Sequence, residues 1–160
     1  MATPDFIVAL RRKIGNDPLW LCGVTAVVTR DDQVLVVQRA DTLAWTPVTG
    51  IVDPGEEPAD AAARETLEEA GIVAEPTRLA LVGVTDEIVY DNGDRTQYVD
   101  LVFHLTWRSG DPHPADGENV AARWAGPGEL DVLSPDMRRR VDAALHGGPA
   151  AQFGRTPHPS

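Results

Sequence analysis

The chain has too little cysteine, basic charge and continuous apolar sequence for several classes of protein. Its single cysteine, Cys22, excludes an internal disulfide, and with no second Cys or His nearby in sequence we expect a small buried apolar residue rather than a nucleophile. The 14 Lys and Arg residues face 25 Asp and Glu residues, a net charge of −11 that argues against a duplex nucleic acid as ligand. No apolar run approaches the roughly 20 residues that cross a bilayer, and the first residues do not resemble a secretory signal. We therefore expect a cytoplasmic protein that does not enter a membrane.

The length of 160 residues predicts one domain with a sizeable core. Apolar residues at helical spacing predict a short helix over 5–14, within an N-terminal segment 1–16 that packs on the domain or extends it. The domain itself is expected over 17–146. Residues 147–160 contain glycine and proline but no periodic apolar set, so we expect this tail to be disordered.

Alternating and β-rich runs predict a series of strands between these segments. Their expected ranges are 23–29, 34–39, 45–49, 77–84, 87–90, 96–107 and 120–124. A C-terminal helix is predicted over 134–146, because Ser134 suits a helix cap and Pro135 the first helical position. Strands mixed with two or three helices predict an α/β fold in which helices cover both faces of one sheet.

The most informative segment runs from Gly50 to Ile72 and contains seven acidic residues. Pro58 suits the first turn of a helix and Gly71 its end, so most of the segment is predicted to be helical. At 100° per residue, three glutamates fall on one side of this helix: Glu65, Glu68 and Glu69. Five residues occupy the opposite side and are expected to pack on the core: Ala59, Ala63, Thr66, Leu67 and Ala70.

Three neighbouring carboxylates repel one another and need a counter-charge. Hard divalent cations with oxygen ligands supply one, and Mg²⁺ commonly brings phosphate oxygens with it. The alternative is a solvated acidic face, which is the common role of glutamates on a helix. The spacing therefore favours a metal-dependent enzyme that hydrolyses phosphoanhydride bonds.

The same segment resembles the Nudix box, Gly-x5-Glu-x7-Arg-Glu-U-x-Glu-Glu-x-Gly-U, where U is a large aliphatic residue. The matching positions are Gly50, Glu56, Arg64, Glu65, Glu68, Glu69, Gly71 and Ile72. The chain departs from the box at the first U, which is Thr66, and many relatives have a glycine where Thr49 precedes the box. The resemblance implies a Nudix-type α/β/α sandwich with a mixed β-sheet between helices.

The resemblance also implies roles for individual residues. Glu65, Glu68 and Glu69 would bind Mg²⁺, for which Mn²⁺ can substitute, together with the backbone carbonyl of Thr49. Glu118 precedes the last strand, where many relatives recruit a further acid, although a solvent-facing loop glutamate fits that position equally well.

Glu56 and Arg64 would be structural and electrostatic partners within the same site. Asp116 is the less favoured substitute for Glu118. The general base varies across the family, so Glu69 and Glu118 both stay open for this role.

Other residues have two interpretations each. Arg39 closes a strand at the position where relatives contact substrate phosphates, but a strand-end arginine is as often a surface charge. Trp45 could stack on a base or pack beneath the loop. Packing is expected for Trp107 and Trp124, and a hydrogen-bonded structural role for His104.

The family hydrolyses nucleoside diphosphates linked to another group. A nucleoside or deoxynucleoside triphosphate is the favoured small-molecule substrate here, with ADP-ribose or a dinucleoside polyphosphate as the alternative. A nucleotide-binding sensor without catalysis is the alternative of another class, but such domains usually lack a box carboxylate, and none is missing. Homodimers are common among relatives, and the N-terminal helix offers an interface.

Overall fold

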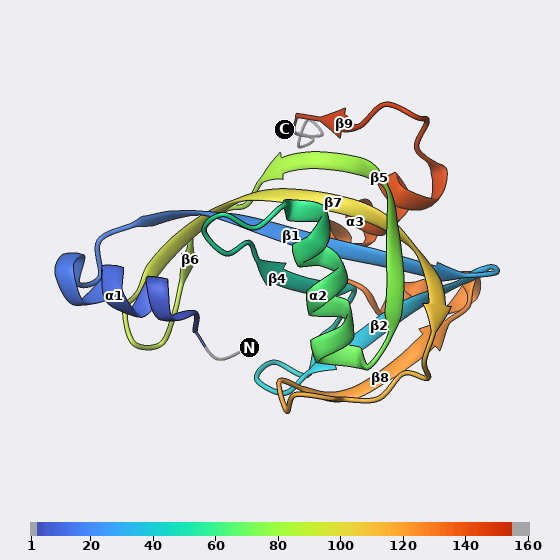
Figure 1. The fold of residues 1–160 in the computed structure, drawn as a ribbon, viewed down its shortest axis with the longest axis horizontal. Coiled ribbons are helices and arrows are strands. Elements are labelled where there is room, and N and C mark those ends of the chain that lie inside the picture. The colour runs from blue at the N-terminus through green and yellow to red at the C-terminus, as the bar shows by residue number, and fades with distance from the viewer. Residues whose placement is uncertain (1–2, 155–160) are drawn as a thin grey trace.

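The computed structural model describes residues 3–154, which form a mixed β-sheet with helices on both faces (Figure 1). The helices are α1 (Asp5–Ile14), α2 (Pro58–Ala70), α3 (Pro135–His146) and a short 3₁₀ helix, η1 (Pro127–Val132). The strands are β1 (Leu19–Arg30), β2 (Gln33–Arg39), β3 (Trp45–Thr46), β4 (Val48–Ile51), β5 (Val73–Val84), β6 (Ile88–Val89), β7 (Arg95–Ser109), β8 (Asn119–Ala125) and β9 (Gln152–Phe153).

Strand β1 lies at the centre of this sheet. It runs parallel to β7, from Leu19 opposite Thr96 to Thr29 opposite Thr106, and pairs antiparallel with β4. The main path through the sheet is β3-β2-β1-β7-β5-β9, while β4 joins β1, β6 joins β7 and β8 joins β2. Because successive side chains of a strand point to opposite faces, β1 contributes to the layers on both sides.

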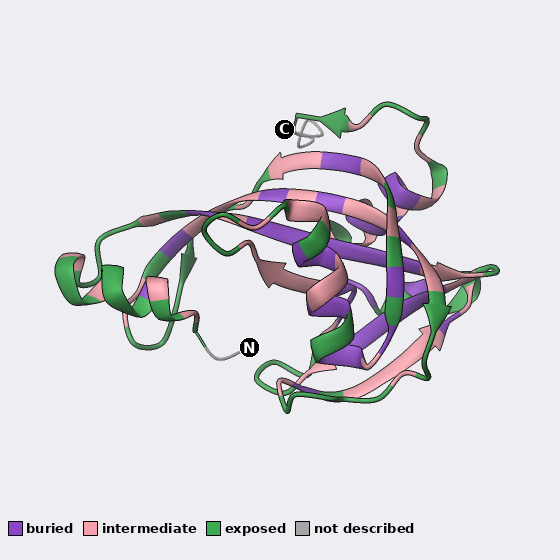
Figure 2. Cartoon of the chain, in the orientation of Figure 1, coloured by how far each residue is buried: buried purple, intermediate pink, exposed green. Residues whose placement is uncertain are grey.

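Two apolar clusters form these layers. Val24 and Ala26 of β1 belong to the cluster that contains Ala62 of α2, whereas Val27 belongs to the cluster that contains Val141 of α3. The buried side chains accordingly concentrate in the central strands and on the inner sides of the two helices (Figure 2). This arrangement confirms the predicted α/β/α sandwich.

Local chemistry fixes the ends of the two covering helices. Pro58 opens α2 at its first position, and Gly71 closes it in the left-handed conformation with φ 67°. A Cβ on Gly71 would lie 2.1 Å from Cε1 of His113 and would displace that exposed ring, and the left-handed φ itself favours glycine. In α3 the hydroxyl of Ser134 accepts a hydrogen bond from the backbone N–H of Met137 at 3.3 Å, which confirms the predicted cap.

Helix α1 has the predicted bounds and stands at one end of the molecule (Figure 1). Arg11 connects it to β7, because its Nη2 atom donates to the carbonyl of Arg95 at 2.6 Å and to the hydroxyl of Thr96 at 3.1 Å. None of the helices within residues 3–154 is long and apolar enough to span a bilayer.

The predicted disorder of the tail over 147–160 is wrong for its described part. Strand β9 pairs in parallel with β5, and Arg139 donates a hydrogen bond to the carbonyl of Gly154 at 2.7 Å. Residues 155–160 lie outside the described part of the chain. The pairing strand is only two residues long, too short for an alternating pattern to show in the sequence.

Two smaller expectations also differ from the structure. Leu67 was expected to pack on the core but is 50% exposed. Cys22 is half-buried rather than buried, and burial raises the pKa of its thiol, with Asp100 adding to the effect. A raised thiol pKa agrees with the prediction that Cys22 is not a nucleophile.

Candidate active site

Two of the three glutamates of helix α2 point toward the protein interior. Glu65 is 1% exposed and Glu69 4% exposed, whereas the side chain of Glu68 is 52% exposed. The buried stripe of the helix therefore carries carboxylates among small residues such as Ala62 and Thr66. Buried carboxylates are costly unless they are paired or bind a cation.

Gly50 of β4 makes room for the first of these glutamates. A Cβ on Gly50 would lie 2.2 Å from the carboxyl carbon of Glu65, so any side chain there would displace it. The Glu65 carboxylate accepts a hydrogen bond from Nη1 of Arg64 at 3.0 Å. Burial raises the pKa of Glu65, while Arg64 and a backbone hydrogen bond from Ile51 act in the opposite direction.

Arg64 links three acidic residues of the box into one ion-pair network. Its Nε and Nη2 atoms donate to the two carboxylate oxygens of Glu56 at 2.8 and 2.9 Å. Its Nη1 atom donates to Glu65 at 3.0 Å and to Glu68 at 3.2 Å, and Nη2 also reaches the carbonyl of Ile51 at 3.2 Å. The forked guanidinium thus orients three carboxylates at once, a geometry that an ammonium group cannot reproduce.

The buried carboxylate of Glu69 meets two acids from the loop before β8. One oxygen from each of Glu69, Asp116 and Glu118 lies within 4.8 Å of the others. The loop is connected to the end of α2, because the N–H of Ala115 donates to the carbonyl of Glu69 at 3.1 Å. We call these three residues the acidic group.

Asn119 holds Glu69 in this position. Its Nδ2 atom donates to Oε2 of Glu69 at 3.0 Å, and both side chains are buried. Burial raises the pKa of Glu69 to about 7, with the charges of Glu65 and Asp116 adding to the effect of burial and the Asn119 hydrogen bond opposing it. Asn119 follows Glu69 by 50 positions and matches no part of the box, so no sequence signal identified it.

The acidic group fits a divalent cation. It offers hard oxygen ligands from three carboxylates, and their mutual repulsion together with the burial of Glu69 favours a bound positive charge. Glu65 and Glu68, which were also predicted as ligands, lie instead against Arg64. The full predicted set of metal ligands, including the carbonyl of Thr49, therefore stays a prediction.

A cleft of about 760 Å³ adjoins this group. Glu118, Thr49 and Gly50 line it, and so does the predicted phosphate-binding residue Arg39. Arg39 makes a two-pronged ion pair with Asp41, at 2.9 and 2.7 Å, and this pair lowers the pKa of Asp41 to about 2. A cleft of this size suits a small-molecule ligand such as a nucleotide.

Three tryptophans and one histidine that the sequence singled out have structural roles. Trp45 does not line the cleft; it packs on the apolar cluster beneath α3, and the guanidinium of Arg123 lies 4.9 Å from its ring centroid. The structure thus favours packing over base stacking for Trp45. Trp107 and Trp124 pack on the other cluster, and His104 hydrogen-bonds two threonine hydroxyls at 2.9 Å each, as predicted.

Comparison with known proteins identifies the family. The family model of the NUDIX domain matches residues 21–145. A "Putative 8-oxo-dGTP diphosphatase" of Bacillus subtilis (strain 168) is 32% identical over 125 residues, which cover 76% of each chain. A "MutT-like protein" of Streptomyces ambofaciens is 33% identical over 139 residues, which cover 84% of this chain and 83% of that protein.

A solved structure shares the fold. The crystal structure of a NUDIX hydrolase from Nitrosomonas europaea superimposes with a TM-score of 0.66 at 24% identity, covering 84% of this chain and 77% of that one. The matched domain includes α2, with all its box carboxylates, and the acidic group. The chain belongs to the Nudix family and is a Nudix hydrolase.

Proposed function

We propose that the protein is a Mg²⁺-dependent pyrophosphatase that hydrolyses a phosphoanhydride bond of a nucleoside or deoxynucleoside triphosphate. The observation that carries this proposal is the meeting of Glu69, Asp116 and Glu118 beside a nucleotide-sized cleft that also contains Arg39. The name of the Bacillus relative, a putative 8-oxo-dGTP diphosphatase, supports a triphosphate substrate. ADP-ribose and dinucleoside polyphosphates are the alternatives within the same chemistry.

A divalent cation held by the acidic group would neutralise phosphate oxygens and lower the pKa of a bound water. The hydrogen bond from Asn119 orients the Glu69 carboxylate, which lies beside Asp116 and Glu118. Arg64 likewise orients the carboxylates of Glu56, Glu65 and Glu68 by donating hydrogen bonds to them. Glu69 and Glu118 are both candidates for the general base.

Arg39 is the proposed contact for a substrate phosphate. Arg39 and Glu118 both line the cleft, so the guanidinium and the acidic group border the same cavity. The hydrogen bonds with Asp41 raise the pKa of Arg39, and the charge of Glu69 adds to that effect. The phosphate would compete with Asp41 for the forked face of Arg39, because both ligands accept two parallel hydrogen bonds.

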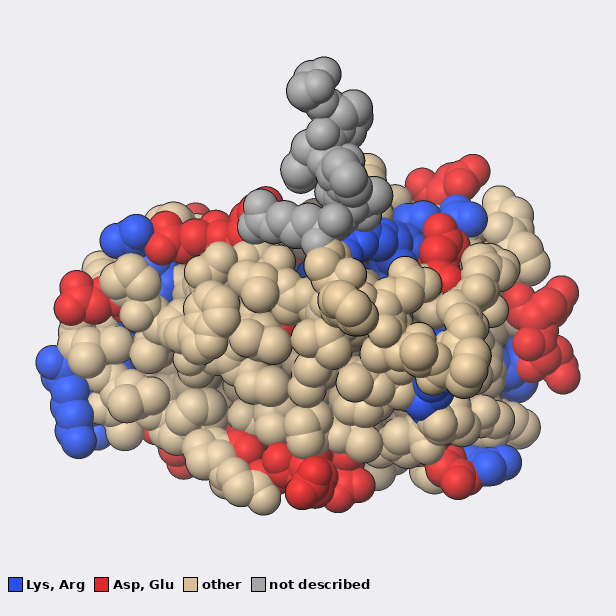
Figure 3. Space-filling model, turned by 90° about the horizontal axis from the view of Figure 1, so that it is seen from above, with Lys and Arg blue, Asp and Glu red and all other residues tan. Residues whose placement is uncertain are grey.

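We also propose that residues 17–146 form the catalytic domain of a cytoplasmic protein, as a monomer or as a homodimer through α1. Its ligands are small nucleotides rather than duplex nucleic acid. On the face shown in Figure 3, basic side chains occur as separate groups beside acidic ones and not as one continuous surface. Binding a duplex backbone needs such a surface.

The test is a hydrolysis screen. The protein is incubated with Mg²⁺ and a panel of nucleoside triphosphates, ADP-ribose and dinucleoside polyphosphates, and the products are quantified chromatographically. We expect turnover of a triphosphate, and a loss of at least about 100-fold in the Glu69→Gln variant. Glu57→Gln is the matched control, since Glu57 is an exposed residue before the same helix. Tight nucleotide binding without any turnover would contradict the proposal and favour the sensor.

A further inference from the structure

Helix α1 borders the cleft, although it lies outside the part of the chain that matches the family. The matched domain begins at residue 21, whereas α1 ends at Ile14. Pro4, Ile7 and Arg11 from this segment nevertheless line the cleft. Strand β6 stands beside α1 at the same end of the molecule (Figure 1). The resemblance to the family therefore does not describe this end of the cleft.

Strand β6 and the residue after it present exposed apolar side chains to the cleft. Ile88 pairs with Thr96 of β7, and paired residues of antiparallel strands point to the same side. Both residues line the cleft, and so does Tyr90, two positions further on. Ile88 is 39% exposed and Tyr90 44% exposed. We call Ile88 and Tyr90 the hairpin wall. Large apolar side chains that stay exposed within a cleft are typical of a ligand-binding surface.

The hairpin that carries this wall has little support of its own. Strand β6 has only two residues, and within residues 3–154 it pairs with β7 alone. Ile88, Val89 and Tyr90 are all exposed, so burial in a core does not fix the strand. A two-stranded ribbon is marginally stable in water unless it packs on another element. The position of the wall therefore depends on contacts from outside the hairpin.

Arg11 of α1 supplies such contacts. Its Nη2 atom donates to the carbonyl of Arg95 at 2.6 Å and to the hydroxyl of Thr96 at 3.1 Å. Its Nε atom lies 3.6 Å from a carboxylate oxygen of Asp94, and its Nη1 atom donates to the carbonyl of Gly15 at 3.1 Å. The side chain of Arg11 is only 13% exposed. Because these nitrogens are engaged within the protein, Arg11 connects the hairpin to α1 and does not offer its charge to a ligand.

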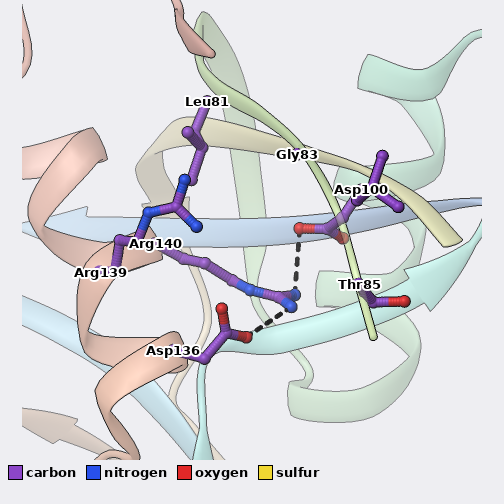
Figure 4. A pocket seen from close by; sticks show the side chains of 8 residues that line it. Leu81, Gly83, Thr85, Asp100, Asp136, Arg139 and Arg140 are labelled. Carbon is purple, nitrogen blue, oxygen red and sulfur yellow. Dashed lines mark hydrogen bonds and ion pairs between the residues drawn. The ribbon is translucent and has the colours of Figure 1, made fainter. Parts of the chain in front are cut away.

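The floor of the cleft differs from the wall, because its charged groups are paired with one another. Nη1 of Arg140 lies 3.0 Å from Oδ2 of Asp100 and donates to the hydroxyl of Thr25 at 2.9 Å. Nη2 of Arg140 donates to Asp136 at 2.7 Å (Figure 4). Asp100 and Arg140 both line the cleft, but they are only 7% and 8% exposed. The hairpin wall thus offers more open surface to an uncharged part of a ligand than this floor does.

We propose that Arg11 is a positioning residue that holds the hairpin wall against the nucleoside part of the substrate. The proposal rests on the proposed function as a nucleotide hydrolase. Arg39, the proposed phosphate contact, lines the same cleft as the wall. A nucleobase presents a flat face that apolar and aromatic side chains bind by stacking and burial. Helix α1 then determines how tightly the nucleoside binds, without touching the reacting phosphates.

The first test compares ligands with and without a nucleoside. Affinities for the four deoxynucleoside monophosphates and for inorganic phosphate are determined by calorimetry in EDTA, so that metal binding does not contribute. We expect the wild type to bind at least one monophosphate at least about 10-fold more tightly than inorganic phosphate, a ratio that stacking of one base can supply. We call this ratio the nucleoside preference.

Two neighbouring arginines of α1 provide matched variants. Arg11→Ala removes the connection to the hairpin and should reduce the nucleoside preference to less than about 3-fold. Arg12→Ala is the control, because Arg12 is exposed and is not among the described residues that line the cleft. It should keep the wild-type preference. Both variants should bind Mn²⁺ like the wild type, since other elements form the acidic group.

Steady-state kinetics separate positioning from a loss of folded protein. For a triphosphate that the wild type hydrolyses, Arg11→Ala should raise KM at least about 10-fold and change kcat less than about 3-fold, because it removes binding that substrate and transition state share. Partial unfolding would instead lower the apparent kcat and leave KM unchanged.

A variant of the wall itself decides the question if the melting temperature shows that Arg11→Ala does not fold. Ile88→Ala shortens the wall and leaves Arg11 in place, and it should reduce the nucleoside preference at least about 3-fold. Val8→Ala is its control. Val8 is 36% exposed, close to the 39% of Ile88, but is not among the described residues that line the cleft. It should keep the wild-type preference.

The outcomes separate the two proposals. An unchanged preference in folded Arg11→Ala, or in Ile88→Ala, would overturn the role of Arg11. Equal affinities of the wild type for inorganic phosphate and for every monophosphate would also overturn it, even if triphosphates are hydrolysed. Absence of turnover for every nucleotide would overturn the proposed function, whereas a preference that Arg11→Ala removes and Arg12→Ala keeps would still support the role of Arg11 in binding.

Discussion

Replacing Glu69 by glutamine is expected to stabilise the metal-free protein at neutral and alkaline pH. Burial raises the pKa of Glu69 from 4.5 to about 7. An acid whose pKa is raised by folding contributes stability that is fully present below its unfolded pKa and is lost as the pH rises through its folded pKa. For Glu69 this loss falls between about pH 4.5 and pH 7.

The size of the effect follows from the shift. A pKa change from 4.5 to about 7 corresponds to about 3 kcal/mol at 1.36 kcal/mol per unit, taken as an upper limit. Glutamine carries no charge, and its carbonyl oxygen can still accept the hydrogen bond from Asn119. At pH 8 in EDTA, Glu69→Gln should therefore unfold at a higher urea concentration than the wild type, and the difference should vanish near pH 4.5.

Mg²⁺ should reverse this order. A cation that binds only the folded protein stabilises it, and the loss of a ligand carboxylate weakens that binding. The assay is urea unfolding at pH 4.5, 6 and 8, with EDTA or with excess Mg²⁺, and Glu57→Gln serves as the control of equal charge change. A Glu69→Gln variant that is no more stable than the wild type at pH 8 in EDTA would refute the reasoning.

Three further predictions concern the surroundings of the site. Gly50→Ala should lower the free energy of unfolding by at least about 1 kcal/mol in a urea titration, because the new Cβ would lie 2.2 Å from Glu65. Arg64→Lys should reduce kcat at least about 10-fold with little change in the circular dichroism spectrum, because lysine keeps the charge but loses the fork. Asn119→Ala should weaken Mg²⁺ binding about 10-fold in calorimetry, since Glu69 loses the donor that orients it. Unchanged stability, kcat or affinity, respectively, would contradict each prediction.

The sequence predicted the parts of the fold that depend on local chemistry. Pro58 and Gly71 mark the ends of α2, and Ser134 caps α3, because each acts through its own backbone or a neighbouring turn. Alternation identified the long strands for the same reason. The α/β/α arrangement followed from the order of these elements and from the resemblance to the Nudix box.

The rotation of α2 about its axis could not be predicted in this way. The helix is rich in alanine, so its apolar pattern does not distinguish one side clearly. Contact with Gly50 decides the matter, since the gap left by its missing side chain receives Glu65 and turns Leu67 outward to 50% exposure. That contact depends on how β4 pairs with β1, which the helix sequence does not contain.

The sequence likewise did not predict the hydrogen-bond partners of the site residues. Asn119 meets Glu69 across 50 positions, and Arg140 meets Thr25 across 115. Such pairs follow from the order of the strands in the sheet and from the docking of α3, not from a motif. The opposite charges of Asp41 and Arg39 in the sequence also could not show that these two side chains form a two-pronged ion pair.

The central claim is that the carboxylate of Glu69, together with Asp116 and Glu118, binds a divalent cation. Titration of Mn²⁺ into the protein, followed by electron paramagnetic resonance of the free ion, tests it most directly. We predict saturable binding by the wild type and by Glu57→Gln, and at least about 10-fold weaker binding by Glu69→Gln. Equal Mn²⁺ affinity in Glu69→Gln and the wild type would contradict the claim.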